Sequence, residues 1–193
     1  MAATLTKAML EDVSIGCACV KLVEQTYDIT DTTFDNADEI YTESGTLSID
    51  QAEDSKTEIK IDQGDQTIAT TYEKGEFTIT GKVPSTAIPL FEYFYSSANI
   101  TSPTLTAGIT GSDGTTKYKT AKGFDISGQR KKVTMFVESE SRNTALIFTN
   151  VELVPTFTWG DVKTTPIGIT FNGTVLAATK DKAPSLIILK QGE

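Results

Sequence analysis

Short runs of alternating apolar and polar residues fill the middle of the chain. They occur at residues 46–50, 57–62, 66–72 and 76–80, where apolar and polar side chains largely alternate. Side chains alternate between the two faces of a strand, so this period is typical of half-buried antiparallel strands. Residues with turn chemistry separate the later runs, at Gly64-Asp65 and Lys74-Gly75. The pattern therefore predicts successive strands joined by tight turns.

Further strands are predicted in the second half, at residues 118–124, 132–137, 145–154, 156–159, 167–176 and 186–189. Residues 1–44 have no sustained period. Residues 13–23 could form a strand or two short ones, and an acidic stretch follows. We therefore expect one mainly β domain over residues 1–193, with residues 1–44 as an N-terminal arm or long-loop region. The expected architecture is an antiparallel β-sandwich or partly closed barrel of about ten strands with one flanking α-helix.

The single helix is predicted from near Pro89 to near Ser97. Its apolar positions recur at helical spacing, and proline suits the first turn of a helix. The side chains expected to pack on the sheet are Ile88, Phe91, Phe94 and Tyr95. An aromatic stripe could also line a ligand pocket. If the stripe is packed, replacing Phe91 or Phe94 with alanine should cost about 3–5 kcal/mol of stability.

Composition narrows the class of protein. Apolar residues make up 38% of the 193 residues, which is normal for a soluble folded chain. No apolar run is long enough for a membrane-spanning helix, and the first ten residues do not resemble a secretory signal. The two cysteines, Cys17 and Cys19, are too close together to favour a disulfide between them, and they lack the partners of a structural zinc site. We expect them to be buried or half-buried thiols without a chemical role.

Charge is distributed unevenly along the chain. Residues 1–65 hold 15 acidic and 4 basic side chains, whereas residues 66–193 hold 11 acidic and 13 basic ones. The net charge of −9 therefore comes from the first third of the chain. Such asymmetry concerns partners and electric fields rather than the fold.

Few residues suggest catalysis. The chain has no histidine, which excludes histidine-dependent nucleophilic sites and histidine-ligated metals. Gly108, Gly111 and Gly114 do not have the spacing of a phosphate-binding loop. The acidic cluster Asp31, Asp35, Asn36, Asp38 and Glu39 lacks the EF-hand spacing and glycine, and is expected to be a solvated loop. We expect no enzyme, no cofactor and no metal, although a small hydrolase with a paired-carboxylate site stays open.

One basic run precedes a predicted strand, at Arg130-Lys131-Lys132. It could contact nucleic-acid phosphates or an acidic neighbouring subunit. It could equally be a solubilising strand edge.

The order of features from about Gly45 to Leu176 resembles the tail tube (major tail) proteins of long-tailed bacteriophages. The resemblance begins with the strand Gly45–Ile49 and an acidic strand pair. It continues with residues 74–84, KGEFTITGKVP, which lead directly into the helix. It ends with residues 145–153, ALIFTNVEL, before a final hairpin of residues 156–159 and 167–176.

The resemblance implies a structural virion protein that assembles with itself. Six copies would form a ring whose inner strands join into one barrel, and stacked rings would form a tube. Its partners would be further copies, the tape measure protein, tail terminator and baseplate proteins, and DNA passing through without sequence-specific binding. The location would be the virion tail, after assembly in the bacterial cytoplasm, without membrane insertion.

An acidic lumen is expected on the same basis. Along residues 45–65 the apolar side chains point one way and the charged ones the other. In a ring, the charged face would repel DNA phosphates weakly and keep the duplex mobile; in a single sandwich it would only meet water. The lumen candidates are Asp50, Glu53, Asp54, Glu58, Asp62 and Asp65.

An alternative function of a different class is a carbohydrate- or host-surface-binding β-sandwich module, which would need exposed aromatic residues.

Overall fold

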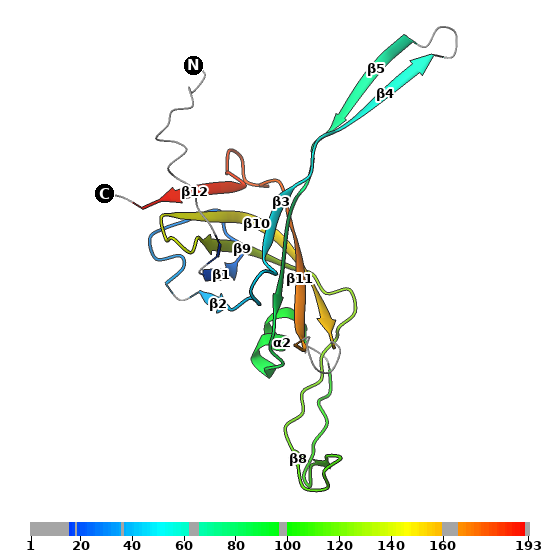
Figure 1. Cartoon of the computed structure of the whole chain (residues 1–193), viewed down its shortest axis with the longest axis vertical. Coiled ribbons are helices and arrows are strands. Elements are labelled where there is room, and N and C mark those ends of the chain that lie inside the picture. Colours follow the sequence, from blue (N-terminus) through cyan, green and yellow to red (C-terminus); the bar gives the residue numbers. More distant parts are fainter. Residues whose placement is uncertain are drawn as a thin grey trace.

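The computed structural model describes residues 16–17, 19–35, 37–61, 66–96, 100–159 and 166–191, with the backbone alone at residues 60, 61 and 66–68. This part of the chain holds twelve β-strands and one α-helix. Figure 1 shows an elongated molecule, with a body built on a sheet and one arm projecting from each end. The prediction of a mainly β, antiparallel fold with one flanking helix is confirmed.

Eight strands form the sheet of the body, in the order β2-β1-β9-β10-β11-β6-β3, with β12 also paired to β10. All paired strands are antiparallel. β2 and β3, at the two ends of this order, do not pair with each other, so the sheet is not closed into a barrel. The strands are β1 (Cys19–Glu24), β2 (Asp38–Ile40), β3 (Ser48–Gln51), β6 (Phe77–Val83), β9 (Lys131–Glu138), β10 (Thr144–Thr158), β11 (Gly168–Val175) and β12 (Leu186–Lys190).

The long strand β10 divides this sheet into two layers. Its first half pairs with β12 and its second half with β11, and the register towards β9 shifts between Phe148 and Val151. At the shift, the buried side chains of Thr149 and Asn150 donate hydrogen bonds to the carbonyl oxygens of Pro184 (2.6 Å) and Ala177 (2.9 Å). We call β2, β1, β9, the first half of β10 and β12 the β12 layer. The second half of β10, β11, β6 and β3 are the β3 layer.

One hydrophobic core lies under both layers. Alternate residues of β9, namely Val133, Met135 and Val137, are at most 7% exposed. The β1 neighbours of the last two, Leu22 and Val20, are equally buried. The β3 layer contributes Ile79, Ile169 and Phe171 to the same core. The alternation read from the sequence is therefore the alternation between core and surface.

The helix, α2 (Ile88–Phe94), covers one end of this core. Pro89 lies in its first turn, and Tyr95 caps the other end through a backbone hydrogen bond to Phe91. The ring of Phe94 stacks on that of Phe171 with centroids 6.2 Å apart. Phe94 and Tyr95 are 3% exposed, whereas Ile88 and Phe91 are half-buried. The predicted start is correct; the predicted end at Ser97 lies outside the described residues, and the described helix ends at Phe94.

The upper arm is a two-stranded hairpin of β4 (Ser55–Ile61) and β5 (Gln66–Glu73). The apolar side chains of residues 45–65 were expected to point one way, opposite to the charged ones. That expectation is wrong for the whole segment, because β3 pairs with β6 in the body whereas β4 pairs with β5 in the arm. The three residues between β3 and β4 do not reverse the chain, so β4 continues out of the body (Figure 1). Ile59 is consequently 50% exposed instead of facing the core.

The lower arm comprises residues 100–125 and carries two very short strands, β7 (Ile109–Thr110) and β8 (Lys117–Tyr118). The strand predicted at residues 118–124 is therefore mostly absent, because residues 119–124 lie along the arm beside no described strand. Residues 111–114 form a turn, closed by the hydrogen bond from the Gly114 amide to the Gly111 carbonyl oxygen.

Asp113 organises the tip of this arm. Its carboxylate accepts bonds from the backbone amides and hydroxyls of Thr115 and Thr116. The bonds from Thr116, above all, lower the pKa of Asp113 from its ordinary value. Because the pKa is lowered in the folded state, the turn keeps this stabilisation at neutral pH and loses it only as pH falls below the ordinary aspartate range near about 4.

Replacing Asp113 with alanine should loosen the tip without unfolding the body. The amides of Thr115 and Thr116 lose their acceptor, so we expect their hydrogen exchange to accelerate about tenfold, which corresponds to roughly one hydrogen bond. Asp113→Asn, which keeps an acceptor oxygen, should show a smaller change. Unchanged exchange in Asp113→Ala, measured by NMR, would contradict this role.

The region predicted as an N-terminal arm or long loop is partly built into the body. β1 and β2 belong to the main sheet, and Val20, Leu22 and Ile40 are at most 7% exposed. The described residues between these strands, 25–35 and 37, form a loop. The arm assignment is therefore wrong for β1 and β2, because β2 pairs with β1 and β1 pairs with β9. Residues 1–15 lie outside the described part. No described helix is long and apolar enough to cross a membrane.

Candidate assembly surfaces

The outer face of the β3 layer is lined by hydroxyl and amide groups. Cross-strand register places these side chains on one face, opposite the core. We call it the hydroxyl face; its polar side chains are Ser48, Thr78, Thr80, Thr156, Thr170, Asn172 and Thr174, and one exposed apolar side chain, Val154, lies among them. All are exposed or half-buried, and the hydroxyl oxygens of Ser48 and Thr80 lie 2.9 Å apart.

Three charged side chains share this face, and two of them are neutralised locally. Lys82 forms an ion pair with Glu43 (2.8 Å), and Glu152 forms one with Arg130 (3.0 Å). Asp50, on the marginal strand β3, is the third. The hydroxyl face is therefore close to neutral, although the chain carries a net charge of −9.

Both margins of the β3 layer are open among the described residues. β3 pairs only with β6. On the opposite margin, the pairing of β9 with β10 ends at Lys131 and Leu153, so residues 154–158 of β10 have β11 alone as a neighbour. Unpaired backbone amides and carbonyls at a strand edge are a template for another strand. The β3 layer can therefore be extended on either side.

The four acidic lumen candidates that the structure describes do not form one face. Asp50 is on β3, Glu53 and Asp54 lie where β3 passes into β4, and Glu58 is on the upper arm, where it forms an ion pair with Lys56. Asp62 and Asp65 lie outside the described residues. Their orientation towards a lumen stays a prediction. Among the described residues, no group of three or more Cys, Asp or Glu side chains is placed to hold a metal ion.

The basic run is divided between different surroundings. The guanidinium of Arg130 donates a hydrogen bond to the carboxylate of Glu152. Lys131 is half-buried, with its ammonium nitrogen 3.2 Å from the centroid of the Tyr93 ring and 3.0 Å from the Tyr93 carbonyl oxygen. Burial lowers the pKa of Lys131 and raises that of Tyr93. Arg130 and Lys132 are both exposed, and Lys132 lies on the outer face of β9. A phosphate or inter-subunit contact by this run stays a prediction.

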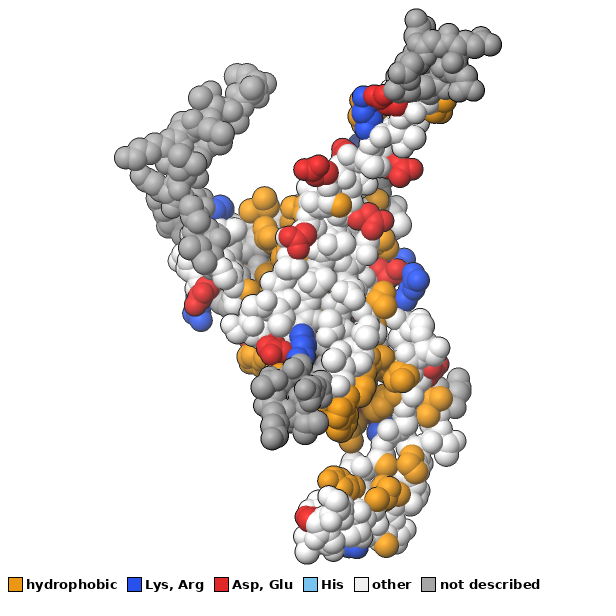
Figure 2. Space-filling model, turned by 45° about the vertical axis from the view of Figure 1, so that its right-hand side comes forward, with side chains coloured by type: hydrophobic (Ala, Val, Ile, Leu, Met, Phe, Trp, Pro, Cys, Tyr) orange, Lys and Arg blue, Asp and Glu red, His pale blue; other side chains and the backbone are white. Residues whose placement is uncertain are grey.

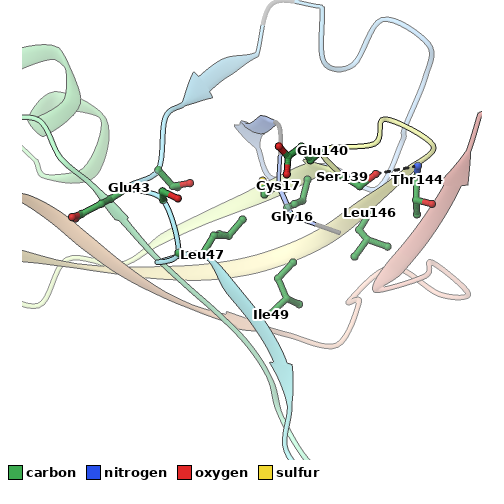
Figure 3. A pocket seen from close by; sticks show the side chains of 13 residues that line it. Gly16, Cys17, Glu43, Leu47, Ile49, Ser139, Glu140, Thr144 and Leu146 are labelled. Atoms are coloured by element: carbon green, nitrogen blue, oxygen red, sulfur yellow. Dashed lines mark hydrogen bonds between the residues drawn. The ribbon is translucent and has the colours of Figure 1, made fainter. Parts of the chain in front are cut away.

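A groove of about 800 Å³ opens between β3 and the strands β9 and β10 (Figure 3). Its apolar lining includes Leu47, Ile49, Val137 and Leu146, and its carboxylates are Glu43 and Glu140. Glu43 is held by Lys82, and the hydroxyl of Ser139, another lining residue, bonds within its own turn to Asn143. No nucleophile and base are paired in the described lining.

Cys17, also at this groove, is exposed, and Cys19 is half-buried. Exposure of Cys17 contradicts the expectation that both thiols are shielded, since it lies just before β1 begins. Burial, as the largest effect, nevertheless raises the pKa of both thiols and disfavours their reactive thiolate forms.

An exposed aromatic cluster lies at the end of the body that carries α2. Trp159 is 70% exposed, and its ring lies 6.3 Å from that of Phe157, which is 37% exposed. Phe157 contacts Phe91 (5.5 Å), which contacts Phe124 (5.6 Å). We call Trp159, Phe157, Phe91 and Phe124, with the exposed Ile100 near Gly123, the base patch. Figure 2 shows hydrophobic side chains gathering at this end of the body, beside the lower arm.

Neither the hydroxyl face nor the base patch was identified from the sequence. Threonine at alternate positions of β6 and β11 is a sequence signal that could have predicted the hydroxyl face. The alternating Phe157 and Trp159 at the end of a strand are a weaker signal for the base patch. No protein-family model matches the chain, and no curated protein matches it significantly.

Proposed function

We propose that this protein is a structural subunit that assembles with copies of itself into a tube, as a phage tail tube protein does. The observation that carries the proposal is an elongated subunit with unpaired sheet margins on its two sides and an arm at each end. Side margins allow lateral joining and end arms allow axial joining. A tube requires both.

Strand direction supports the lateral contact. The four strands of the β3 layer alternate in direction, so β3 runs opposite to β10. When a second copy is placed beside the first by rotation, its β10 margin meets the β3 margin of its neighbour in antiparallel orientation. The contact between two copies therefore continues the antiparallel pairing that exists within the β3 layer. Each further copy repeats the same contact.

What the tube would enclose follows from the resemblance to tail tube proteins. In that function the rings are hexameric and surround the tape measure protein and later the DNA. The location is then the tail of the virion.

Electron microscopy tests the proposal directly. Purified full-length protein should form rings or tubes in negative stain, and its mass by light scattering should rise with concentration. A chain that remains monomeric at all accessible concentrations would overturn the proposal.

A glycan-binding module is the second candidate, favoured by the exposure of Trp159 beside Phe157. Sugar rings stack on exposed aromatic side chains. In this case the monomer should bind on a glycan array, and Trp159→Ala should abolish binding. Assembly without glycan binding would exclude this candidate.

A further inference from the structure

The groove between β3 and the strands β9 and β10 is an open end of the hydrophobic core. Cross-strand register sets Met135 of β9 beside Phe148 of β10, and both are at most 1% exposed. The β3 layer covers this pair, with the ring of Phe77 lying 6.4 Å from that of Phe148. One step towards the groove, the next pair on the same face is Val137 and Leu146, and Leu146 is only half-buried. The cover of the core therefore ends before its apolar surface does.

This apolar surface extends across a third strand and has a second wall. The row continues past Leu146 to Ile188 of β12, which is 59% exposed. On the opposite side, Leu47 and Ile49 line the groove and are half-buried. Figure 3 shows Leu47, Ile49 and Leu146 around the same space. Two apolar walls separated by a groove of about 800 Å³ expose surface that a further segment would bury.

The described chain begins at this groove. Gly16 and Cys17 belong to its lining, and the fifteen residues before them lie outside the described part. Gly16 has a φ of +70°, and a Cβ atom there would lie 2.6 Å from a carboxylate oxygen of Glu140, another lining residue. Val13 and Ile15 are therefore tethered within about 11 Å of the lining, because three extended residues reach no further.

The sequence just before Gly16 has the pattern of a half-buried strand. Val13 and Ile15 are apolar, and the polar residues Asp12 and Ser14 alternate with them. Side chains alternate across an extended segment, so Val13 and Ile15 can enter the groove together. Little chain entropy opposes this contact, because no long loop has to be closed between the segment and the groove.

From these observations we propose that residues 13–15 fold back into the groove of their own chain. Val13 and Ile15 then cover its apolar walls and close the open end of the core. The contact is made within one copy, so it does not depend on the proposed tube.

Cys17 reports this contact, because it lines the groove and the chain has only one other cysteine, Cys19. In a Cys19→Ser background, labelling by N-ethylmaleimide measures how accessible the Cys17 thiol is. Val13→Ser/Ile15→Ser removes the apolar cover, so its Cys17 should be labelled at least about tenfold faster than that of the unmodified segment. Rates measured across pH separate a change in access from a change in the thiol pKa.

Val13→Ile/Ile15→Val is the matched control. It exchanges the two side chains and keeps their apolar surface, so Cys17 should stay as protected as with the unmodified segment. Circular dichroism melting establishes that both double variants are folded.

Methyl NOEs test the contact in the unmodified chain. The methyl groups of Val13 and Ile15 should show NOEs to those of Leu47 and Leu146, in labelled protein diluted with unlabelled protein so that only contacts within one copy are seen. Absence of these NOEs, or equal labelling of the unmodified protein and the serine variant, would overturn the proposal. Protection of Cys17 that appears only as protein concentration rises would place another copy's segment in the groove, and would overturn it too. None of these results decides whether rings or tubes form, so the proposed function is tested separately.

Discussion

Replacing Phe94 with alanine should lower the free energy of unfolding by about 3–5 kcal/mol, because the change leaves a cavity under α2. Phe94 is 3% exposed, and its ring stacks nearly parallel to that of Phe171, at an interplanar angle of 13°. Phe171 in turn lies against Gly81, where the ring occupies the space of a side chain. The ring of Phe94 is thus one layer of a stack of packed groups. The remaining groups cannot move to fill the cavity that its removal would leave. Urea denaturation followed by circular dichroism measures the effect.

Two further substitutions calibrate this result. Phe91→Ala should cost less than Phe94→Ala, since Phe91 is half-buried and belongs to the base patch. Tyr118→Ala, at a side chain 59% exposed on the lower arm, should change stability by no more than about 0.5 kcal/mol. A loss below about 1 kcal/mol for Phe94→Ala would mean that the helix is not anchored through this ring.

Substituting valine for Gly75 should displace the upper arm and abolish tube formation. Gly75 lies where the arm joins the body, and a Cβ atom there would overlap the carbonyl oxygen of Ala52. The join is otherwise held by bonds from the Gly75 amide to Asp54 (2.8 Å) and from the Ala52 amide to the Glu76 carbonyl oxygen (2.9 Å). Backbone cannot yield as a flexible side chain can, so the two chain segments must separate.

We expect tube mass, counted in negative stain, to fall at least about tenfold, and the body to lose no more than the roughly 1–3 kcal/mol typical of overpacking. Lys74→Val, at the exposed neighbouring position, is the matched control and should assemble normally. Normal tubes from Gly75→Val would show that assembly does not depend on the direction of the arm.

Alternation identified most strands, because it follows directly from burial of one strand face. It could not identify their partners. The runs at residues 46–50 and 57–62 have the same period, but nothing in that period shows that β3 returns to β6 while β4 leaves the body. Partner choice depends on contacts between residues far apart in sequence, such as Ile49 opposite Ile79.

Pro155 illustrates a second limit. It lies between the two strands predicted at residues 145–154 and 156–159, yet β10 runs through it without interruption. Beyond Leu153 the strand has no neighbour on the β9 side, and a proline without an amide hydrogen is tolerated where one side of a strand is unpaired. A sequence pattern cannot show that a strand has an open side.

The surfaces were harder to predict than the fold. The acidic candidates were chosen by charge, but their strands lie partly on an arm outside the sheet. Trp159 could be noted from composition, whereas its exposure depends on where β10 ends relative to α2. Surface exposure is a property of the assembled fold and not of a local window.

In the proposed tube, the hydroxyl face has a consequence for transport. α2 and the β12 layer lie on the core side of the β3 layer, so a closed ring has room for them only outside, and the hydroxyl face lines the channel. A basic wall would bind DNA by displacing counterions from its phosphates. Its affinity for DNA would then fall as salt concentration rises, by a power of about 0.9 for each phosphate contacted. Neutral hydroxyls exchange hydrogen bonds with a layer of water and release no ions. Friction on a moving duplex should then be low and nearly independent of ionic strength, so that the speed of passage is set by the pressure driving the DNA.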